Sequence, residues 1–489
     1  MENKTYEYIV IGAGYGGVTA ASLLAANGVD VLLLESHTVI GGCASFYKRK
    51  NFTFDVGATT FSGVLPHQPL GKLFDELGIK PNLKKLDPGM VIMMGTQKII
   101  RHAEKEKWIE EAIRVFGEKG QKLFWNELYA LSEKAWAIVG ANYKIPPVDI
   151  TDFVSLFKIK NIKALPLLKA LFTPVSSLLK KCGLHEHPMF YRFIKEQLLI
   201  TSQNTPEDTP LLTAAMGLTY PSETYYPYGG MYKPGQLLLD KFKDNGGIVK
   251  FKSKVSEILS IPGGYELKTM KGESYFTRGL ISNIPVWNLA KITEGKAKKY
   301  FENFTRKFPK AWGAFTLYFA IESRVELETL YYQIHTKREI PFIESNAFFV
   351  SFSAQDDVEK APEGWRTITI SAHVDVQKWN LDDIDEYERR KVMVTERFIE
   401  EFDLAFECFS GLEKLHLLSG TPGTFEFFTG RFKGYVGGIP HSVKNNLLRL
   451  PPGKTPFSNF YITGDTVFPG QGTPAVVLGA LNVVKRILI

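Results

Sequence analysis

The apolar positions near the start of the chain form two short continuous runs separated by small residues. The first run covers residues 8–11, and the second covers residues 31–34, within a segment 29–35 that ends in the carboxylate of Glu35. Short apolar runs bounded by glycine are typical of buried strands. We therefore expect a strand, a glycine-rich turn at 12–17, a helix of small residues and a second strand, which together begin a Rossmann-like α/β fold.

The glycine-rich turn has the spacing of a dinucleotide-binding site. Gly12 allows a tight turn out of the strand, Gly14 leaves room for a pyrophosphate, and Gly17 lets the helix pack on the sheet. The free N–H groups of the first helical turn would then face the phosphates. Glu35 can accept hydrogen bonds from both hydroxyls of a ribose, and it would repel a 2′-phosphate, so NADP is disfavoured.

A second glycine pair follows the opening unit. Gly41 and Gly42 form this pair, and residues 52–60 alternate like a strand before a turn. The small residues and hydroxyls here, Thr59 among them, stand where a long cofactor would leave the sheet.

The rest of the chain divides into a helical region and regions of mixed pattern. From about residue 67 to residue 215 the pattern predicts an inserted, mainly helical region. If a strand at 254–258 returns to the first sheet, Val255 lies near the adenine; a plain core position is the alternative. We expect helices at 107–116, 121–140, 236–243 and 385–402, and strands at 247–251, 254–258, 265–268, 279–283, 312–321, 347–352 and 367–373.

The C-terminal residues predict a strand, a Gly-Asp turn and a final helix. The strand covers residues 459–465 and ends in Gly464 and Asp465, and a helix is expected at 475–489. Gly464 permits close approach, and the Asp465 side chain can hydrogen-bond a polyol. The helix N-terminus at 472–475 would offer backbone N–H groups to the pyrimidine edge of a flavin, whose reduced ring is anionic.

Composition narrows the class of protein. The chain has 489 residues, of which 44% are hydrophobic and 23% charged, which is typical of a globular protein with several domains. The 35 phenylalanines and 21 tyrosines can line a long apolar cavity or fill a large core. No charged region precedes an apolar stretch at the start, and no apolar run reaches about eighteen residues, so we expect neither secretion nor a spanning helix.

The cysteines and histidines suggest no disulfide framework and no metal site. The three cysteines, Cys43, Cys182 and Cys408, are odd in number and far apart, which favours a reducing compartment. The alternating pair His185 and His187 is interpreted as a solvated turn.

The segment 155–185 concentrates the positive charge of the chain. It contains no acidic residue and interleaves apolar residues with six lysines: Lys158, Lys160, Lys163, Lys169, Lys180 and Lys181. This mixture suits a short helical segment lying on an anionic membrane surface, with an ordinary surface helix as the alternative. Nucleic-acid binding is disfavoured because no reading motif accompanies the lysines.

Together these motifs resemble the FAD-dependent, amine-oxidase-like flavoproteins, and within them the phytoene desaturase and carotenoid isomerase family. The matching segments are 12–17 with Glu35, the pair 41–42, the Pro-x-Gly-Gly-Met loop at 227–231, the Ser-Asn signature at 281–283, and residues 421–428. Residues 42–44 and 464–472 resemble the isomerase branch. Thr473 and Pro474 resemble desaturases instead, so the branch stays open.

The resemblance implies FAD as the cofactor and a three-part fold. A discontinuous Rossmann-like FAD-binding domain is expected at 1–66, 223–300 and 441–489, with a mixed-sheet substrate domain at 301–440 and a helical insertion at 67–222. The implied cofactor site comprises Gly12, Ala13, Gly14, Gly16, Gly17, Glu35, Ser36, Gly41, Gly42, Cys43, Ala44, Thr59, Val255, Asn283, Gly464, Asp465, Gly472, Thr473, Pro474 and Ala475.

The resemblance also implies an enzyme that acts on a hydrophobic polyene. The leading expectation is cis–trans isomerisation of a carotenoid through reduced flavin, in a cytoplasmic protein bound peripherally to a membrane through 155–185. Carotenoid desaturation, retinoid saturation or carotenoid ketolation are the alternatives, and a soluble amine oxidase or a flavin-free carrier of prenylated GTPases is the alternative from another class. No catalytic side chain is assigned: Glu426 and Tyr228 are as readily structural.

Overall fold

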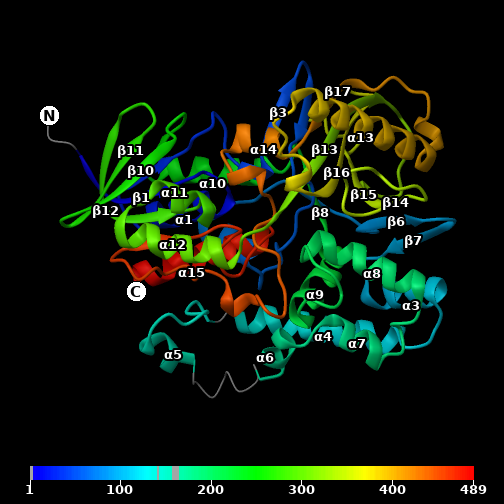
Figure 1. The fold of residues 1–489 in the computed structure, drawn as a ribbon, viewed down its shortest axis with the longest axis horizontal. Coiled ribbons are helices and arrows are strands. Elements are labelled where there is room, and N and C mark those ends of the chain that lie inside the picture. Colours follow the sequence, from blue (N-terminus) through cyan, green and yellow to red (C-terminus); the bar gives the residue numbers. More distant parts are fainter. Residues whose placement is uncertain (1–3, 140–141, 157–164) are drawn as a thin grey trace.

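A computed structural model describes residues 4–139, 142–156 and 165–489 of the chain. The protein is built on two seven-stranded sheets with helices around them (Figure 1). The first sheet has the order β10-β11-β12-β1-β2-β9, with β18 paired to β12. Its strands are β1 (Thr5–Ile11), β2 (Val31–Leu34), β9 (Ile248–Lys250), β10 (Val255–Ile261), β11 (Gly264–Thr269), β12 (Ser274–Ser282) and β18 (Phe460–Ile462).

The first sheet confirms the strands expected at both ends of the chain and in its middle. Its centre is parallel, because β1 pairs with both β2 and β12, and β18 pairs parallel to β12. Strands β10, β11 and β12 form an antiparallel meander at one side. Segments separated by hundreds of residues therefore lie side by side at the carboxyl end of β1.

Three helices pack around the opening unit. They are α1 (Tyr15–Ala26), α10 (Tyr232–Asp244) and the final helix α15 (Thr473–Leu488). The Ser22 hydroxyl on α1 donates to the carbonyl of Leu238 on α10. Helix α1 is buried along nearly its whole length, which explains why small residues dominate it.

The second sheet has the order β17-β13-β16-β15-β14-β6-β7 and carries a long helix on one face. Phe315 and Phe319 on β13 contact Phe398 and Phe402 on that helix, with ring centroids 5.5 and 5.2 Å apart. The elements are β6 (Met90–Met94), β7 (Gln97–Arg101), β13 (Trp312–Glu322), β14 (Tyr331–His335), β15 (Ala347–Phe352), β16 (Trp365–Asp375), β17 (Leu415–Gly420) and helix α13 (Ile384–Ala405).

Most of the expected helical region is helical. Its helices are α2 (Pro69–Leu77), α3 (Lys105–Phe116), α4 (Gln121–Val139), α5 (Ile150–Leu156), α6 (Leu165–Phe172), α7 (Val175–Lys181), α8 (Pro188–Thr201) and α9 (Leu211–Thr219). A cluster of aromatic rings holds α3, α4 and α8 together, and the Arg101 guanidinium lies 3.7 Å from the Trp108 ring centroid inside it. Burial lowers the pKa of Arg101 to about 10.

The expectation of helix is wrong for residues 83–101. Strand β5 (Leu83–Lys85) pairs with β8 (Tyr225–Pro227), and β6 runs parallel to β14, so this stretch belongs to sheets. The apolar run of β6 is too short for periodicity to separate strand from helix. The remaining elements are β3 (Phe46–Arg49), β4 (Phe52–Asp55), α11 (Val286–Ile292), α12 (Gly295–Lys307) and α14 (Pro422–Thr429).

The lysine-rich segment is described only in part. Lys158, Lys160 and Lys163 lie outside the described residues, whereas α6 and α7 fall within the rest of the segment. In the described part of the chain, no helix has both the length and the apolar character needed to span a bilayer.

Candidate cofactor site

The glycine-rich turn joins β1 to α1 in a conformation that needs glycine. Gly12 has φ +90°, and a Cβ at Gly17 would lie 1.9 Å from the Gly12 carbonyl oxygen. Helix α1 begins after Gly14, and in the described structure no side chain caps it. The first N–H groups of α1 are therefore free to point at an anion, as expected for a phosphate-binding turn.

The second glycine pair packs directly on this turn. The Gly41 N–H donates to the Ala13 carbonyl oxygen at 2.9 Å, and Gly14 and Gly41 form an isolated β-bridge. A Cβ at Gly42 would lie 3.8 Å from the Gly14 Cα atom. The structure thus brings together the two glycine motifs, which the sequence separates by more than twenty residues.

Asn283 links the turn to the C-terminal part of the site. Its side-chain amide donates to the Gly12 carbonyl oxygen at 3.4 Å. A Cβ at Gly16 would lie 2.6 Å from Asn283 Oδ1, and a Cβ at Gly464 would lie 3.0 Å from the same atom. Glycine at 16 and 464 therefore leaves room for the Asn283 side chain at the centre of the site.

Three buried polar atoms beside the N-terminus of α1 fit a polar ligand. Among the described residues, Ser282 Oγ, Asn283 Oδ1 and Thr463 Oγ1 have no hydrogen-bond partner. Thr463 Oγ1 would lie 3.1 Å from a Cβ at Gly16. Buried polar groups normally find a partner because leaving one without a bond costs about 1–3 kcal/mol. The residues present thus fit a phosphate-bearing cofactor.

Glu35 holds the backbone on both sides of the expected ribose position. Its Oε2 accepts from the Ala13 N–H at 2.6 Å, and its Oε1 accepts from the His37 N–H at 2.7 Å and from the Ser36 hydroxyl at 3.0 Å. A carboxylate has about four lone-pair sites, so one remains for a ligand hydroxyl. The sequence did not indicate these internal bonds, and the ribose contact stays a prediction.

Val255 lies two residues after Ser253, which hydrogen-bonds to Glu35. It begins β10 and is buried, and the Ser253 N–H donates to the Glu35 carbonyl oxygen at 2.8 Å. This path is compatible with the predicted adenine contact of Val255 and equally with a core role.

Asp465 has a partner that sequence reasoning missed. Its Oδ2 accepts a hydrogen bond from Nη2 of Arg431 at 2.6 Å, and the two side chains are 18% and 13% exposed. Cys43 lies near both: burial raises the pKa of its thiol, Arg431 opposes this shift, and Asp465 adds to it. In the sequence, only Asp465 itself indicated that a positively charged partner lies nearby, because a buried carboxylate needs a partner.

The final helix begins where the sequence predicts. Gly472, with φ +92°, precedes the first helical residue, Thr473, and in the described structure no side chain caps the helix. A Cβ at Gly63 would lie 2.6 Å from Pro474 Cγ. The start of α15 therefore packs against Gly63, in the chain after β4, and its contact with a flavin ring stays a prediction.

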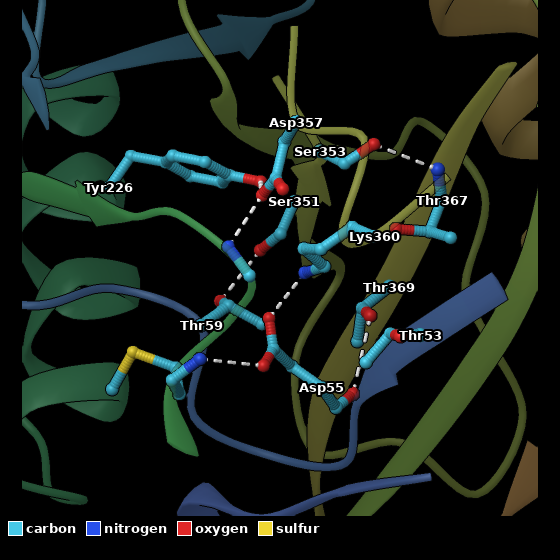
Figure 2. A network of polar contacts seen from close by, with 12 residues as sticks. Thr53, Asp55, Thr59, Tyr226, Ser351, Ser353, Asp357, Lys360, Thr367 and Thr369 are labelled. Atoms are coloured by element: carbon cyan, nitrogen blue, oxygen red, sulfur yellow. Dashed lines mark hydrogen bonds and ion pairs between the residues drawn. The ribbon is translucent and has the colours of Figure 1, made fainter. Parts of the chain in front are cut away.

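The chain after β4 is tied to the second sheet by hydroxyl groups. The Ser351 hydroxyl donates to Thr59 Oγ1 at 2.6 Å, and the Tyr331 hydroxyl donates to the Thr59 carbonyl oxygen at 2.6 Å (Figure 2 shows the first of these contacts). The Tyr318 hydroxyl donates to the Val56 carbonyl oxygen. Since Ser351 already uses the Thr59 hydroxyl, a cofactor contact by Thr59 stays a prediction.

A buried ion pair lies beside these contacts. Lys360 Nζ is 2.5 Å from Asp55 Oδ2, and the Met231 N–H donates to Asp55 Oδ1 at 2.8 Å (Figure 2). A Cβ at Gly230 would lie 2.7 Å from Asp55 Oδ1. The Pro-x-Gly-Gly-Met loop is therefore fixed between the first strand pair, β3 and β4, and the second sheet.

Tyrosine side chains near this segment are kept neutral by burial. Burial raises the pKa of Tyr220 to about 12 and raises the pKa values of Tyr318 and Tyr331 further. The surroundings of residues 56–60 are thus strongly desolvated, which favours an apolar ligand over a charged one.

Comparisons with known proteins agree with the site. A family model described as an NAD(P)-binding Rossmann-like domain matches residues 10–77. Prolycopene isomerase 1, chloroplastic, from an Oncidium hybrid cultivar is 27% identical over 509 residues, which cover 99% of this chain and 84% of that protein. The carotenoid 3,4-desaturase of Haloarcula japonica is 22% identical, and the match covers 98% of this chain and 97% of that protein. The homologues of this chain are carotenoid isomerases and desaturases.

The solved structures give the same fold. Cyclohexylamine oxidase from Brevibacterium oxydans matches with a TM-score of 0.61 at 14% identity, over 99% of this chain and 100% of that chain. The expected resemblance to amine-oxidase-like flavoenzymes and the mixed α/β fold are thereby confirmed. The Rossmann-like match and the flavoenzyme fold together support a flavin-type cofactor at this site.

Proposed function

We propose that this protein is an FAD-dependent enzyme that acts on the double bonds of a carotenoid-like polyene, by cis–trans isomerisation. The observation that carries the proposal is the similarity to prolycopene isomerase over 99% of the chain. It is supported by a fold in which the glycine turn at 12–17, the glycine pair at 41–42 and the Gly-Asp turn at 464–465 meet, and we call this place the cradle. The cytoplasmic side of a membrane surface is the proposed location, because a polyene dissolves in lipid.

Different residues of the cradle bind different parts of the proposed FAD. The N–H groups of residues 14–17 and of Gly42 take the diphosphate, Glu35 takes the adenosine ribose, Asp465 takes the ribityl chain, and the N-terminus of α15 faces the ring. When bound, a reduced flavin supplies electron density or a hydride that the polyene returns, so that a double bond rotates without net oxidation.

The protein's own groups provide position and a dry environment for this reaction. The N-terminus of α15 would offer its positive dipole end to the negative charge of a reduced ring held there. The buried tyrosines near residues 56–60 lie in desolvated surroundings, which suit an apolar substrate better than an unpaired charge. No side chain is assigned a proton-transfer role, since isomerisation by this route needs none.

Desaturation is the second candidate, and two observations favour it. Thr473 and Pro474 at the start of α15 resemble desaturases, and the Haloarcula japonica relative is a carotenoid 3,4-desaturase. In this version the same residues would hold oxidised FAD, which would supply a two-electron acceptor for hydrogen from the polyene, with a quinone or oxygen as the final acceptor.

Product analysis separates the two reactions. Flavin-loaded protein is incubated with liposomes that contain a poly-cis carotene or a more saturated carotene, with and without dithionite, and the products are resolved by chromatography and mass spectrometry. Conversion of the poly-cis carotene at constant mass under reducing conditions is expected. Loss of two mass units per step under oxidising conditions would establish the desaturase, and a gain of two would establish a saturase. Peroxide release with amines and no polyene turnover would establish an amine oxidase.

Helix α6 supports the proposed membrane contact. Leu168 and Phe172 are 44% and 53% exposed, Lys169 lies exposed beside them, and α6 lies at the lower edge of the molecule, away from the second sheet (Figure 1). We expect the double substitution Leu168→Ser/Phe172→Ser to reduce flotation with phosphatidylglycerol-containing vesicles. The matched control is Val358→Ser, which alters a residue 72% exposed elsewhere. Equal flotation of the double variant and the control would contradict the membrane contact.

A further inference from the structure

The segments that form the cradle contain no positively charged side chain. The glycine turn at 12–17, residues 35–46 and residues 463–475 include neither lysine nor arginine, but they include the carboxylates of Glu35 and Asp465. A diphosphate is anionic, and burying an anion close to carboxylates without a compensating cation is costly. A cation from another part of the chain would therefore add to the stabilisation that the N-terminus of α1 gives the anion.

Arg431 is a cation that the fold brings to this place. It follows Gly430, the left-handed residue that ends α14. Its Nη2 donates to Asp465 Oδ2 at 2.6 Å and its Nε donates to the Tyr435 carbonyl oxygen. Its charge also acts on the thiol of Cys43, against the larger effect of burial on that pKa.

The neighbours of Arg431 lie next to the glycine turn on two sides. Cys43 follows Gly42, whose Cβ position is 3.8 Å from the Gly14 Cα atom. Asp465 follows Gly464, which packs on Asn283 beside Gly16. The guanidinium thus lies at the edge of the cradle, between the second glycine pair and the Gly-Asp turn.

Arg431 retains hydrogen-bonding capacity for a ligand. Among the described residues, hydrogen bonds engage its Nε and Nη2 and none engages Nη1. A guanidinium has five N–H donors in a planar fork that matches phosphate oxygens. The Asp465 carboxylate fixes this fork and is itself neutralised by it, so it no longer repels an anion nearby.

We propose that Arg431 is a further cofactor-binding residue, whose guanidinium neutralises Asp465 beside the cofactor diphosphate and offers its Nη1 donors to a phosphate oxygen. The proposal rests on the proposed FAD site and adds a residue to it. Hydrogen bonds to charged groups contribute about 1.5–3 kcal/mol. Loss of the guanidinium is therefore expected to weaken FAD binding by about 10- to 100-fold.

The test measures flavin affinity rather than turnover. Apo-protein is titrated with FAD and with riboflavin, which lacks phosphate, at several salt concentrations, and flavin fluorescence is recorded. Arg431→Gln is expected to weaken FAD by the stated factor, to weaken riboflavin, which shares only the ribityl contact of Asp465, by less, and to flatten the salt dependence of FAD binding. Arg431→Lys keeps the charge and is expected to lose less. The matched control, Arg278→Gln, removes an exposed arginine on β12 and is expected to change nothing.

A second pair of variants guards against misfolding, since Arg431→Gln leaves Asp465 without its cation. The double variant Arg431→Gln/Asp465→Asn has no buried charge here and is compared with Asp465→Asn. The proposal is overturned if both bind FAD equally tightly, or if riboflavin affinity falls as much as FAD affinity in Arg431→Gln. A wild-type protein that binds no flavin would overturn the proposed cofactor itself.

Discussion

The buried pair of Asp55 and Lys360 offers a sharp test of how the two halves of the protein are joined. Lys360 belongs to the loop between β15 and β16 of the second sheet, whereas Asp55 ends β4. Their side chains are only 6% and 4% exposed, with Nζ and Oδ2 2.5 Å apart. The perturbation is Lys360→Met, which keeps the length of the side chain but removes its charge.

The expected loss of stability depends on the hydrogen bonds that Asp55 retains after Lys360 is replaced. In the described structure the side chain of Asp55 would retain one hydrogen bond, from the Met231 N–H at 2.8 Å, and its charge would stay buried. Removing one partner of a buried ion pair costs about 3–5 kcal/mol, whereas replacing both partners by uncharged residues is often close to neutral. The double variant Lys360→Met/Asp55→Asn is therefore expected to recover most of the lost stability.

The assay is equilibrium urea unfolding followed by tryptophan fluorescence, with the wild type, both single variants and the double variant measured as a cycle. Lys122→Met, which alters an exposed lysine on α4, is the control and is expected to shift stability by less than about 0.5 kcal/mol. The reasoning is refuted if Lys360→Met matches this control, or if the double variant loses the sum of the two single losses.

Three further predictions test the site and its surroundings. Gly17→Ala puts a Cβ 1.9 Å from the Gly12 carbonyl oxygen, so we expect a loss of about 1–3 kcal/mol and of bound flavin; a wild-type unfolding midpoint and flavin content would contradict this. Ser351→Ala removes the hydrogen bond to Thr59 and should cost about 1 kcal/mol in urea unfolding, with no change meaning that the bond contributes nothing. Burial lowers the pKa of His441 to about 4, below the unfolded value of about 6.5, so stability should fall as pH drops from about 6.5 to 4, by up to about 1.4 kcal/mol per unit. His441→Asn should flatten this dependence, and an unchanged slope would assign it to other groups.

The sequence predicted best the elements whose conformation is set by neighbouring residues along the chain. The opening strands, the glycine turn and the start of α15 carry their own geometry: Gly12 and Gly472 adopt positive φ, and Gly17 lies against backbone. Strands β6 and β14 were not predicted, although each also pairs with the next strand along the chain, β7 and β15. Period-two or period-3.6 patterns are too short there to decide between helix and strand.

The polar contacts of the site were the least predictable part. Arg431 meets Asp465 only because α14 ends beside the first sheet, and no motif marks that arrangement. Thr59 was expected to face a cofactor, yet its hydroxyl bonds to Ser351 on β15. These hydrogen bonds and ion pairs depend on how the two sheets pack together, and that packing cannot be predicted from a single sequence.

Glu35 shows how one residue can serve the fold and the ligand together. Its carboxylate accepts from the Ala13 N–H inside the glycine turn and from the His37 N–H after β2. Because both oxygens already hold backbone, the turn keeps its shape before any ribose arrives, and the remaining acceptor site is aimed by the same bonds. The acidic residue of the fingerprint is therefore needed as a carboxylate for two reasons. It holds the glycine turn in shape through the Ala13 N–H, and it keeps one acceptor site for the ribose contact that the sequence predicts.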